Sequence, residues 1–272
     1  MSFERHLEGL DYAPCRYAGS RLTFRGPPAD LRRPYVAVVG ACEAFGCYVR
    51  DPFPARLGAR LGHSVVNLGV RNASLDAFLK DDAALHVIAG AAVVVVQAMS
   101  AANLSNRFYV VHARRNDRFL AQSSAMEALF PTVDFSEFAF TQHLLTTLRA
   151  QSADRFRLVE TELRTAWRAR MRTLLDVVRG PAVVLAVRRP GRGVLGRTPL
   201  LVTDQMIADL AGDGVETVAC ACPAATPADL AAMVFPETEV ARAQASLPPS
   251  AHAAIADALL PHVAMAVPTA AE

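Results

Sequence analysis

Five short runs of apolar, mostly β-branched residues recur along the 272-residue chain, and stretches with helical character separate them. Uniformly apolar runs of this length are typical of strands that are buried on both faces, as in parallel sheets covered by helices. The sequence therefore predicts an α/β fold, a three-layer α/β/α sandwich with a mostly parallel, five-stranded, flavodoxin-like sheet. The strands are expected at Tyr35–Gly40, Ser64–Gly69, 91–99, 181–187 and 215–221.

One segment interrupts this alternation of strands and helices. Residues 103–151 are rich in arginine, asparagine, phenylalanine and histidine, have little periodicity, and are long for a connection in a compact fold. We interpret the chain as a single domain, residues 1–272, that carries this arginine- and aromatic-rich insertion. Helices are expected at 51–62, 74–90, 154–180, 204–211 and 249–262, with Asp51 and Ser250 as candidate N-caps.

The charge and the cysteines limit the classes of partner and compartment. A net charge of +2 is small for a general polyanion-binding protein and argues against nucleic acid as a partner, although nearly every basic residue is arginine. Five cysteines without a CxxC pair indicate neither a disulfide framework nor a zinc site, and they favour a reducing compartment. We therefore expect a cytoplasmic protein.

Motifs for membranes, cofactors and metals are not found. The charged N-terminus does not resemble a signal peptide, and no apolar run is long enough to span a bilayer. The chain has no phosphate loop, no dinucleotide-binding turn and no metal-binding spacing, so no cofactor and no metal are expected. The sequence leaves open whether the chain forms a homo-oligomer.

Polar or reactive residues follow three of the predicted strands. They are Gly40-Ala41-Cys42 after the first, Asn67 to Asn72 after the second and Ser100 to Asn103 after the third, while His252 lies near the start of the final helix. Ligands of open α/β sheets bind beyond the carboxyl ends of the strands. A thiol, several amide donors and a histidine are the parts of an acyl-transfer site, namely a nucleophile, an oxyanion hole and a general base.

The order of these residues resembles that of the SGNH, or GDSL-like, hydrolase superfamily. Gly40-Ala41-Cys42 stands where that superfamily has Gly-Asp-Ser, and "NLGVRN" is similar to its Asn-x-Gly-x-x-Gly, with Asn72 in place of the last glycine. "AANL" keeps Asn103 of the third motif, and "PSAH" keeps His252 of the fourth without its acid. The runs 25–36 and 103–119 also resemble an uncharacterised bacterial family known as a domain of unknown function.

The superfamily resemblance implies an ester or thioester hydrolase, or an acyltransferase, that acts on a small-molecule or glycan acyl ester. Cys42 would be the nucleophile and His252 the base, and the Cys42 N–H, the Asn72 backbone and the Asn103 amide would form the oxyanion hole. Glu43 is a candidate either to orient His252 or to carry the proton itself. Asparagine suits position 72 because it tolerates the left-handed backbone that glycine would adopt there. Such an enzyme predicts faster alkylation of Cys42 than of Cys47.

The same residues also have ordinary structural roles. A cysteine at a strand end is often a small buried residue in a turn, and a histidine on a final helix is often a cap or a packing residue. The alternative is a catalytically inactive SGNH-like domain that binds an anionic glycan or a protein partner through the insertion. Its anion-binding residues would be Arg107, His112, Arg114, Arg115 and Arg118. Internal ion pairs with Asp117, Asp134 and Glu137 are a further interpretation of these arginines.

Overall fold

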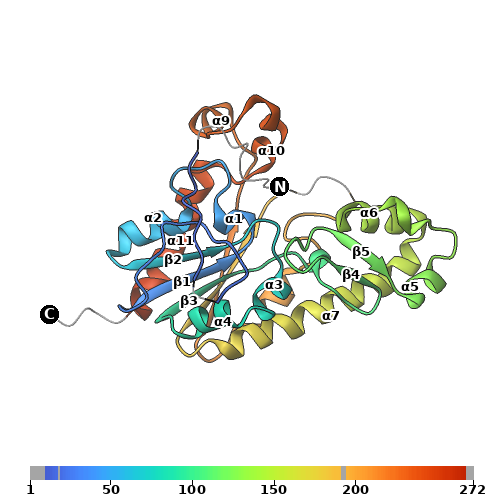
Figure 1. Cartoon of the computed structure of the whole chain (residues 1–272), viewed down its shortest axis with the longest axis horizontal. Coiled ribbons are helices and arrows are strands. Elements are labelled where there is room, and N and C mark those ends of the chain that lie inside the picture. The colour runs from blue at the N-terminus through green and yellow to red at the C-terminus, as the bar shows by residue number, and fades with distance from the viewer. Residues whose placement is uncertain (1–9, 18, 191–193, 268–272) are drawn as a thin grey trace.

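Five parallel strands form the central sheet of the structure, a computed structural model that describes residues 10–17, 19–190 and 194–267 (Figure 1). Their order across the sheet is β2-β1-β3-β6-β7, and every pairing is parallel. The strands are β1 (Tyr35–Gly40), β2 (Ser64–Gly69), β3 (Val93–Gln97), β6 (Ala182–Arg188) and β7 (Val215–Ala221). The predicted α/β fold is confirmed, and three of the five strands have the predicted bounds.

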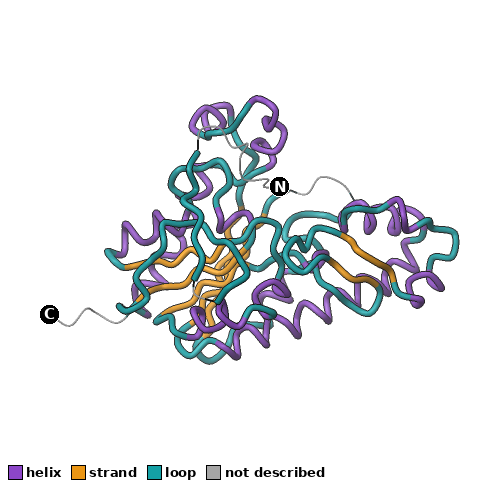
Figure 2. The backbone as a smooth tube through the Cα atoms, viewed as in Figure 1, coloured by secondary structure: helices purple, strands orange, loops and turns teal. Residues whose placement is uncertain are grey.

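Helices cover both faces of the sheet and complete a three-layer α/β/α arrangement (Figure 2). The apolar strands alternate between the two faces, so that Val36 and Val38 of β1 pack in one core and Ala37 and Val39 in the other. The first core lies under α2 (Phe53–Leu61) and α11 (Pro249–Ala266), and the second under α3 (Leu75–Leu79), α4 (Asp82–Ala89) and α7 (Ala153–Val177).

The structure corrects two predicted N-caps and one predicted helix. Asp51 does not cap α2, whose N-cap is Pro52. The helix expected at 74–90 is two helices, because Ser74 caps α3 and Asp81 caps α4 through side-chain bonds to backbone N–H groups. Ser250 does not cap α11, which begins one residue earlier than Ser250 and has Pro248 as its N-cap.

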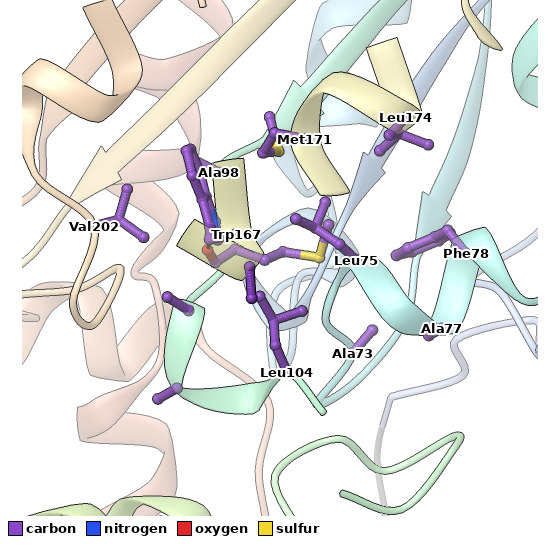
Figure 3. Packing of buried hydrophobic residues seen from close by; sticks show 14 of the residues in the cluster. Ala73, Leu75, Ala77, Phe78, Ala98, Leu104, Trp167, Met171, Leu174 and Val202 are labelled. Atoms are coloured by element: carbon purple, nitrogen blue, oxygen red, sulfur yellow. Dashed lines mark hydrogen bonds between the residues drawn. The ribbon is translucent and has the colours of Figure 1, made fainter. Parts of the chain in front are cut away.

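Trp167 anchors the long helix α7 to the end of β3. The ring is fully buried, and its N–H donates a hydrogen bond to the carbonyl oxygen of Met99 at 2.8 Å. Leu75 of α3 and Leu104 surround it, as Figure 3 shows. The helix is amphipathic, since Leu163 and Met171 are buried on the same face as Trp167, whereas Leu158 is 51% exposed.

The insertion folds as a small lobe at one end of α7 (Figure 1). It contains β4 (Tyr109–Val111), β5 (Phe119–Gln122), α5 (Ser124–Leu129), the 3-10 turn Phe135–Glu137 and α6 (Thr141–Gln151). Its core is continuous with that of the sheet, since Leu144 and Leu148 of α6 and Phe156 of α7 belong to the same apolar cluster as the strands. The remaining elements are α1 (Cys42–Phe45), the 3-10 turns Ala101–Asn103 and Glu237–Glu239, α8 (Asp204–Ala208), α9 (Pro227–Ala232) and α10 (Val240–Ala245).

Candidate functional site

A cleft of about 1420 Å³ opens at the carboxyl end of the sheet. Three strand ends contribute to its wall, because Cys42 follows β1, Arg71 follows β2 and Arg189 follows β6. The chain leaves β1 toward β2 on one side, while β3 lies on the other side, so the strand order reverses at β1. Open α/β sheets bind their ligands at such a switch point.

Positive charge dominates the cleft. Eight arginines line it, against three acidic residues, Asp11, Glu43 and Asp117. The arginines are Arg16, Arg21, Arg71, Arg114, Arg115, Arg118, Arg189 and Arg242. Guanidinium groups gathered in one concave surface repel one another unless an anion lies between them, and several such groups raise the local concentration of anions.

Several arginines of the cleft have no carboxylate partner. Nine arginines outside the cleft form ion pairs with carboxylates among the described residues, and Arg242 of the cleft pairs with Glu239. Arg21, Arg71 and Arg114 are exposed and have no carboxylate partner within the described part of the chain. The guanidinium carbon of Arg71 lies 6.0 Å from the ring centroid of Phe45, a contact that orients the group and leaves its donors available.

Gln97 positions the turn that follows β1. Its side-chain oxygen accepts hydrogen bonds from the backbone N–H groups of Ala41 and Ala44, at 3.0 and 3.3 Å. Its amide nitrogen donates to Glu43 at 2.7 Å. A side chain from β3 thus accepts the free backbone N–H groups at the N-terminus of α1. It also holds Glu43 beside Cys42 in the cleft. The proton-transfer role of Glu43 stays a prediction.

The loop after β2 reaches Cys42 because α1 and β2 approach each other closely at Gly69. A Cβ atom at Gly69 would lie 2.3 Å from the backbone nitrogen of Phe45. Asn67 ties the same two elements together, since its amide donates to the carbonyl oxygen of Ala44 at 2.9 Å and its oxygen accepts from the Gly69 N–H at 2.8 Å. Only glycine allows this contact, which places residues 70–72 on the wall of the cleft.

Asn72 and Cys42 are brought into contact. The backbone N–H of Asn72 donates to the Cys42 sulfur, and the thiol donates to the Asn72 side-chain oxygen, both at 3.3 Å. The left-handed backbone predicted at Asn72 is confirmed, with φ of 58°. The pKa of the Cys42 thiol is nevertheless raised well above its ordinary value, first by the neighbouring thiol of Cys47 and then by burial. The predicted nucleophile and oxyanion roles stay predictions.

Cys47 shares the cleft with Cys42 and interacts with it. Gly46, with φ of 72°, ends α1, and its N–H donates to the carbonyl oxygen of Cys42 at 2.9 Å. The turn brings the two thiols together. The neighbouring Cys42 thiol lowers the pKa of Cys47, and the positive charges of Arg71 and Arg25 act in the same direction against burial. The charges around Cys47 therefore favour its thiolate form.

Arg25 fixes the backbone on which Cys47 lies. Its buried guanidinium donates hydrogen bonds of 2.6–3.0 Å to four carbonyl oxygens, those of Phe45, Gly46, Val49 and Arg50. Burial lowers the pKa of Arg25. The group is satisfied by peptide dipoles, so its role is to shape residues 45–50.

Asn116 docks the insertion onto the loop after β2. The side chain is fully buried and accepts a hydrogen bond from the Ser74 N–H at 2.6 Å, and the Asn116 N–H donates to the carbonyl oxygen of Asn72 at 3.1 Å. Because Arg115 precedes Asn116 and Arg118 follows two residues later, this contact delivers both to the cleft.

Three of the five predicted anion-binding residues of the insertion line the cleft, namely Arg114, Arg115 and Arg118. Arg107 does not, and it forms an ion pair of 3.4 Å with Glu162 of α7. His112 shapes the loop, because its Nδ1 accepts the N–H groups of the two arginines that follow it. The positive charges of Arg115, Arg118 and His112 act on the Asp117 carboxyl, so internal neutralisation of this part of the insertion stays an interpretation.

Two residues predicted for acyl transfer do not line the cleft. His252 is fully buried and stacks on Phe53, whose backbone N–H donates to Nδ1 at 3.0 Å. Burial, with nearby arginines, lowers the pKa of His252 to about 3, so the ring is neutral and carries its proton on Nε2. Asn103 accepts the hydroxyl of Thr141 at 2.7 Å. These contacts do not favour the roles of base and oxyanion donor, which stay predictions.

Sequence reasoning missed Cys47, Gln97, Arg71 and Arg189 as parts of the site. Arg71 and Arg189 lie within two residues of the ends of β2 and β6, so the strand-end rule that singled out Cys42 could have found them. No sequence signal distinguishes Gln97, since its function depends on which strand lies beside β1.

A family profile described as "Domain of unknown function (DUF6473)" matches residues 1–267. The chain belongs to this family. No curated protein matches the chain, and neither does any solved structure. In the described part of this DUF6473 protein, no group of three or more histidine, cysteine or acidic side chains could hold a metal ion. The helices in the same part of the chain all lack the length and apolar character required to cross a membrane.

Proposed function

We propose that the cleft binds an anionic ligand, a glycan or smaller molecule that carries phosphate, sulfate or carboxylate groups. The observation that carries this proposal is the convergence of Arg21, Arg71 and Arg114, from three separate segments, without a carboxylate partner in the described chain. Acidic residues are not scarce, since the chain has 26 of them against 28 basic residues. The positive charge of the cleft therefore results from placement rather than from composition.

The dimensions of the cleft favour an extended ligand. Sites for compact small molecules occupy roughly 300–1000 Å³, whereas this cleft has about 1420 Å³. The arginines on its wall come from the N-terminal segment, two strand ends, the insertion and α10. A ligand with two or more anionic groups would contact several of these walls at once, which suits a charged glycan.

Calorimetric titration with dextran sulfate, and with uncharged dextran as the reference polymer, tests anion binding. We expect binding of dextran sulfate only, with a roughly thirtyfold to 150-fold loss in the Arg71→Gln/Arg114→Gln variant, because each charge-assisted contact contributes about 1–1.5 kcal/mol. Arg107→Gln is the matched control, since it removes an insertion arginine outside the cleft. Equal binding of both polymers, or full affinity in the double variant, would overturn the proposal.

A second candidate function is SGNH-like acyl transfer with Cys42 as the nucleophile. The observation in its favour is that Cys42 lines the cleft with the Asn72 N–H directed at its sulfur. Hydrolysis of p-nitrophenyl acetate and of acetylated sugars by the wild type and by Cys42→Ala tests it, with Cys15→Ala as the control outside the cleft. We expect Cys42→Ala alone to lose the activity. An activity that persists in Cys42→Ala would exclude this candidate.

A further inference from the structure

We propose that Cys42 and Cys47 form a reversible dithiol–disulfide pair in the cleft, in which Cys47 attacks and Cys42 resolves, and that the cleft arginines direct anionic small-molecule disulfides to it. The preference for anions rests on the proposed function, whereas the reactivity of the two thiols does not.

The geometry of the turn places both sulfurs at one point of the cleft. Cys42 begins α1, and Gly46 ends it with a left-handed backbone and a 2.9 Å hydrogen bond back to the carbonyl of Cys42. The thiols of Cys42 and Cys47 lie close enough to shift each other's pKa, and both residues are partly exposed and line the cleft. A Cβ on Gly46 would lie 2.3 Å from Pro52, so the turn also requires glycine for space.

The surroundings divide the roles between the two thiols. The neighbouring Cys42 thiol favours the thiolate of Cys47, and Arg71 and Arg25 lie close enough to stabilise it as well. Cys42 stays protonated because a negative Cys47 and a negative Glu43 both oppose its ionisation. A thiolate beside guanidinium groups is the form that attacks a disulfide, and its protonated neighbour is held ready for the second step.

The other cysteines lack this environment. Burial raises the pKa of Cys15, Cys220 and Cys222, and none of the three lines the cleft. All five cysteines are free thiols, so the pair is in its reduced form. The unreactive thiols give the protein internal controls for selective modification.

The reaction balances with one molecule of an oxidised disulfide, R–S–S–R, as the two-electron oxidant. The Cys47 thiolate attacks one sulfur, the S–S bond of the oxidant breaks, and R–S⁻ leaves. The negative charge of Cys47 is then gone, so one cause of the raised pKa of Cys42 disappears and Cys42 gives its proton to the departing R–S⁻. The Cys42 thiolate attacks the Cys47 sulfur, the protein disulfide forms and the second R–S⁻ leaves.

Three small-molecule disulfides of different charge test both the reactivity of the thiol pair and its preference for anions. The reduced protein is mixed with oxidised glutathione, which is anionic, with neutral 2-hydroxyethyl disulfide or with cationic cystamine, and peptide mass spectrometry follows each cysteine. The rate of each reaction with the protein is divided by the rate at which the same reagent reacts with free N-acetylcysteine, which corrects for the intrinsic reactivity of the reagent. We expect a Cys42–Cys47 disulfide in every case, and a normalised rate at least tenfold higher for oxidised glutathione than for cystamine.

Single variants assign the order of the two steps. Cys42→Ser should accumulate a mixed disulfide of glutathione on Cys47, and Cys47→Ser should react at least tenfold more slowly at Cys42. Arg114→Gln should reduce the rate with oxidised glutathione severalfold more than the rate with 2-hydroxyethyl disulfide, because Arg114 is not among the charges that act on Cys47. Cys15→Ser is the matched control.

The outcomes separate this inference from the anion-binding proposal. Failure of all three reagents to form the Cys42–Cys47 disulfide would overturn the inference, even in a protein that binds dextran sulfate. Full reactivity of Cys47→Ser at Cys42 would overturn the assigned order. Equal normalised rates for the three reagents, with the disulfide formed, would support the thiol pair and overturn its dependence on the anionic cleft.

Discussion

Two regions near the carboxyl ends of the strands hold the residues that the sequence predicts for a catalytic site, and they differ in exposure and charge. In the cleft, Cys42 is partly exposed among arginines, of which Arg71 and Arg114 have no carboxylate partner in the described chain. In the layer between α2 and α11, His252 is fully buried against Phe53 and its pKa is lowered to about 3. The first region suits ligands and reactive thiols, whereas the second suits packing.

Arginines show the same contrast. The buried guanidinium of Arg25 is satisfied by four peptide carbonyl groups and shapes the backbone, while that of Arg71 is exposed in the cleft and only rests on an aromatic ring. The two lie near the same thiol, that of Cys47. The role of each arginine is thus determined by its burial and its hydrogen-bond partners rather than by its residue type. Each of the following substitutions tests this difference between residues that support the fold and residues that line the cleft.

The largest effect is expected for Arg25→Met. It leaves four carbonyl oxygens of residues 45–50 without their donor, and removal of one member of a buried charged network costs about 3–5 kcal/mol. The free energy of unfolding in urea measures the loss. Arg32→Met is the control, because Arg32 is exposed and pairs only with Asp30, so a change within about 0.5 kcal/mol is expected. A loss below about 1 kcal/mol for Arg25→Met would show that residues 45–50 hold their shape by other means.

The next effect is the pH dependence that His252 gives to stability. Burial lowers its pKa from the ordinary 6.5 to about 3, so between these pH values the unfolded chain binds a proton that the folded chain does not. The stabilisation is complete above pH 6.5 and is lost as the pH falls toward 3, at about 1.4 kcal/mol per pH unit.

His252→Gln keeps an acceptor for the Phe53 N–H and does not titrate. Its free energy of unfolding should fall less steeply than that of the wild type between pH 6.5 and 4.5, by about 2–3 kcal/mol over that range. His86→Gln, at an exposed position, should follow the wild type. Parallel pH profiles for the wild type and His252→Gln would mean that His252 is accessible to protons, and would restore it as a candidate base.

The sequence predicted the sheet well because its information is local. Uniformly apolar runs such as Tyr35–Gly40 specify buried parallel strands without reference to their neighbours. Helix ends depended on single capping side chains, and the cap at Asp81 divided a stretch whose apolar pattern is continuous. Residues 103–151 were recognised as unusual, but their lack of periodicity concealed the β-hairpin and the two helices.

The site was predictable only where one strand end defines it. Cys42 and Asn72 follow their strands directly, and they do lie in contact. The burial of His252 depends on how α11 packs against α2, and the role of Gln97 depends on the pairing of β1 with β3. Both depend on tertiary contacts between segments that are far apart in the sequence. The residue types alone therefore predicted His252 as a base and gave no indication that Gln97 belongs to the site.

A smaller effect is expected where the insertion joins the cleft wall. Asn116→Ala leaves the buried Ser74 N–H without an acceptor, which costs about 1–3 kcal/mol in the free energy of unfolding. Since Asn116 also positions Arg115 and Arg118, binding of dextran sulfate should weaken severalfold. Gln151→Ala, which removes an exposed hydrogen bond to Thr132, is the control for both readouts. Destabilisation without weaker binding would indicate that the insertion arginines do not contact the ligand.

The smallest effect concerns Asp117, the one acidic side chain that the insertion contributes to the cleft. Burial raises the pKa of this carboxyl, and its buried Oδ1 has no hydrogen-bond partner. Ionised Asp117 repels an anion held a few ångströms away by about 0.5–1 kcal/mol, so Asp117→Asn should bind dextran sulfate about two to five times more tightly at pH 8.

The direction of the pKa shift gives this last prediction a pH signature. As the pH falls through the raised pKa, Asp117 becomes neutral and wild-type affinity should rise to that of Asp117→Asn, while sulfate ester groups keep their charge. Glu127→Gln, which removes an acid outside the cleft, should show no such convergence. If Asp117→Asn binds no more tightly than the wild type at pH 8, the ligand does not approach the insertion wall, and the arginines from the strand ends and the N-terminal segment would have to supply the binding energy.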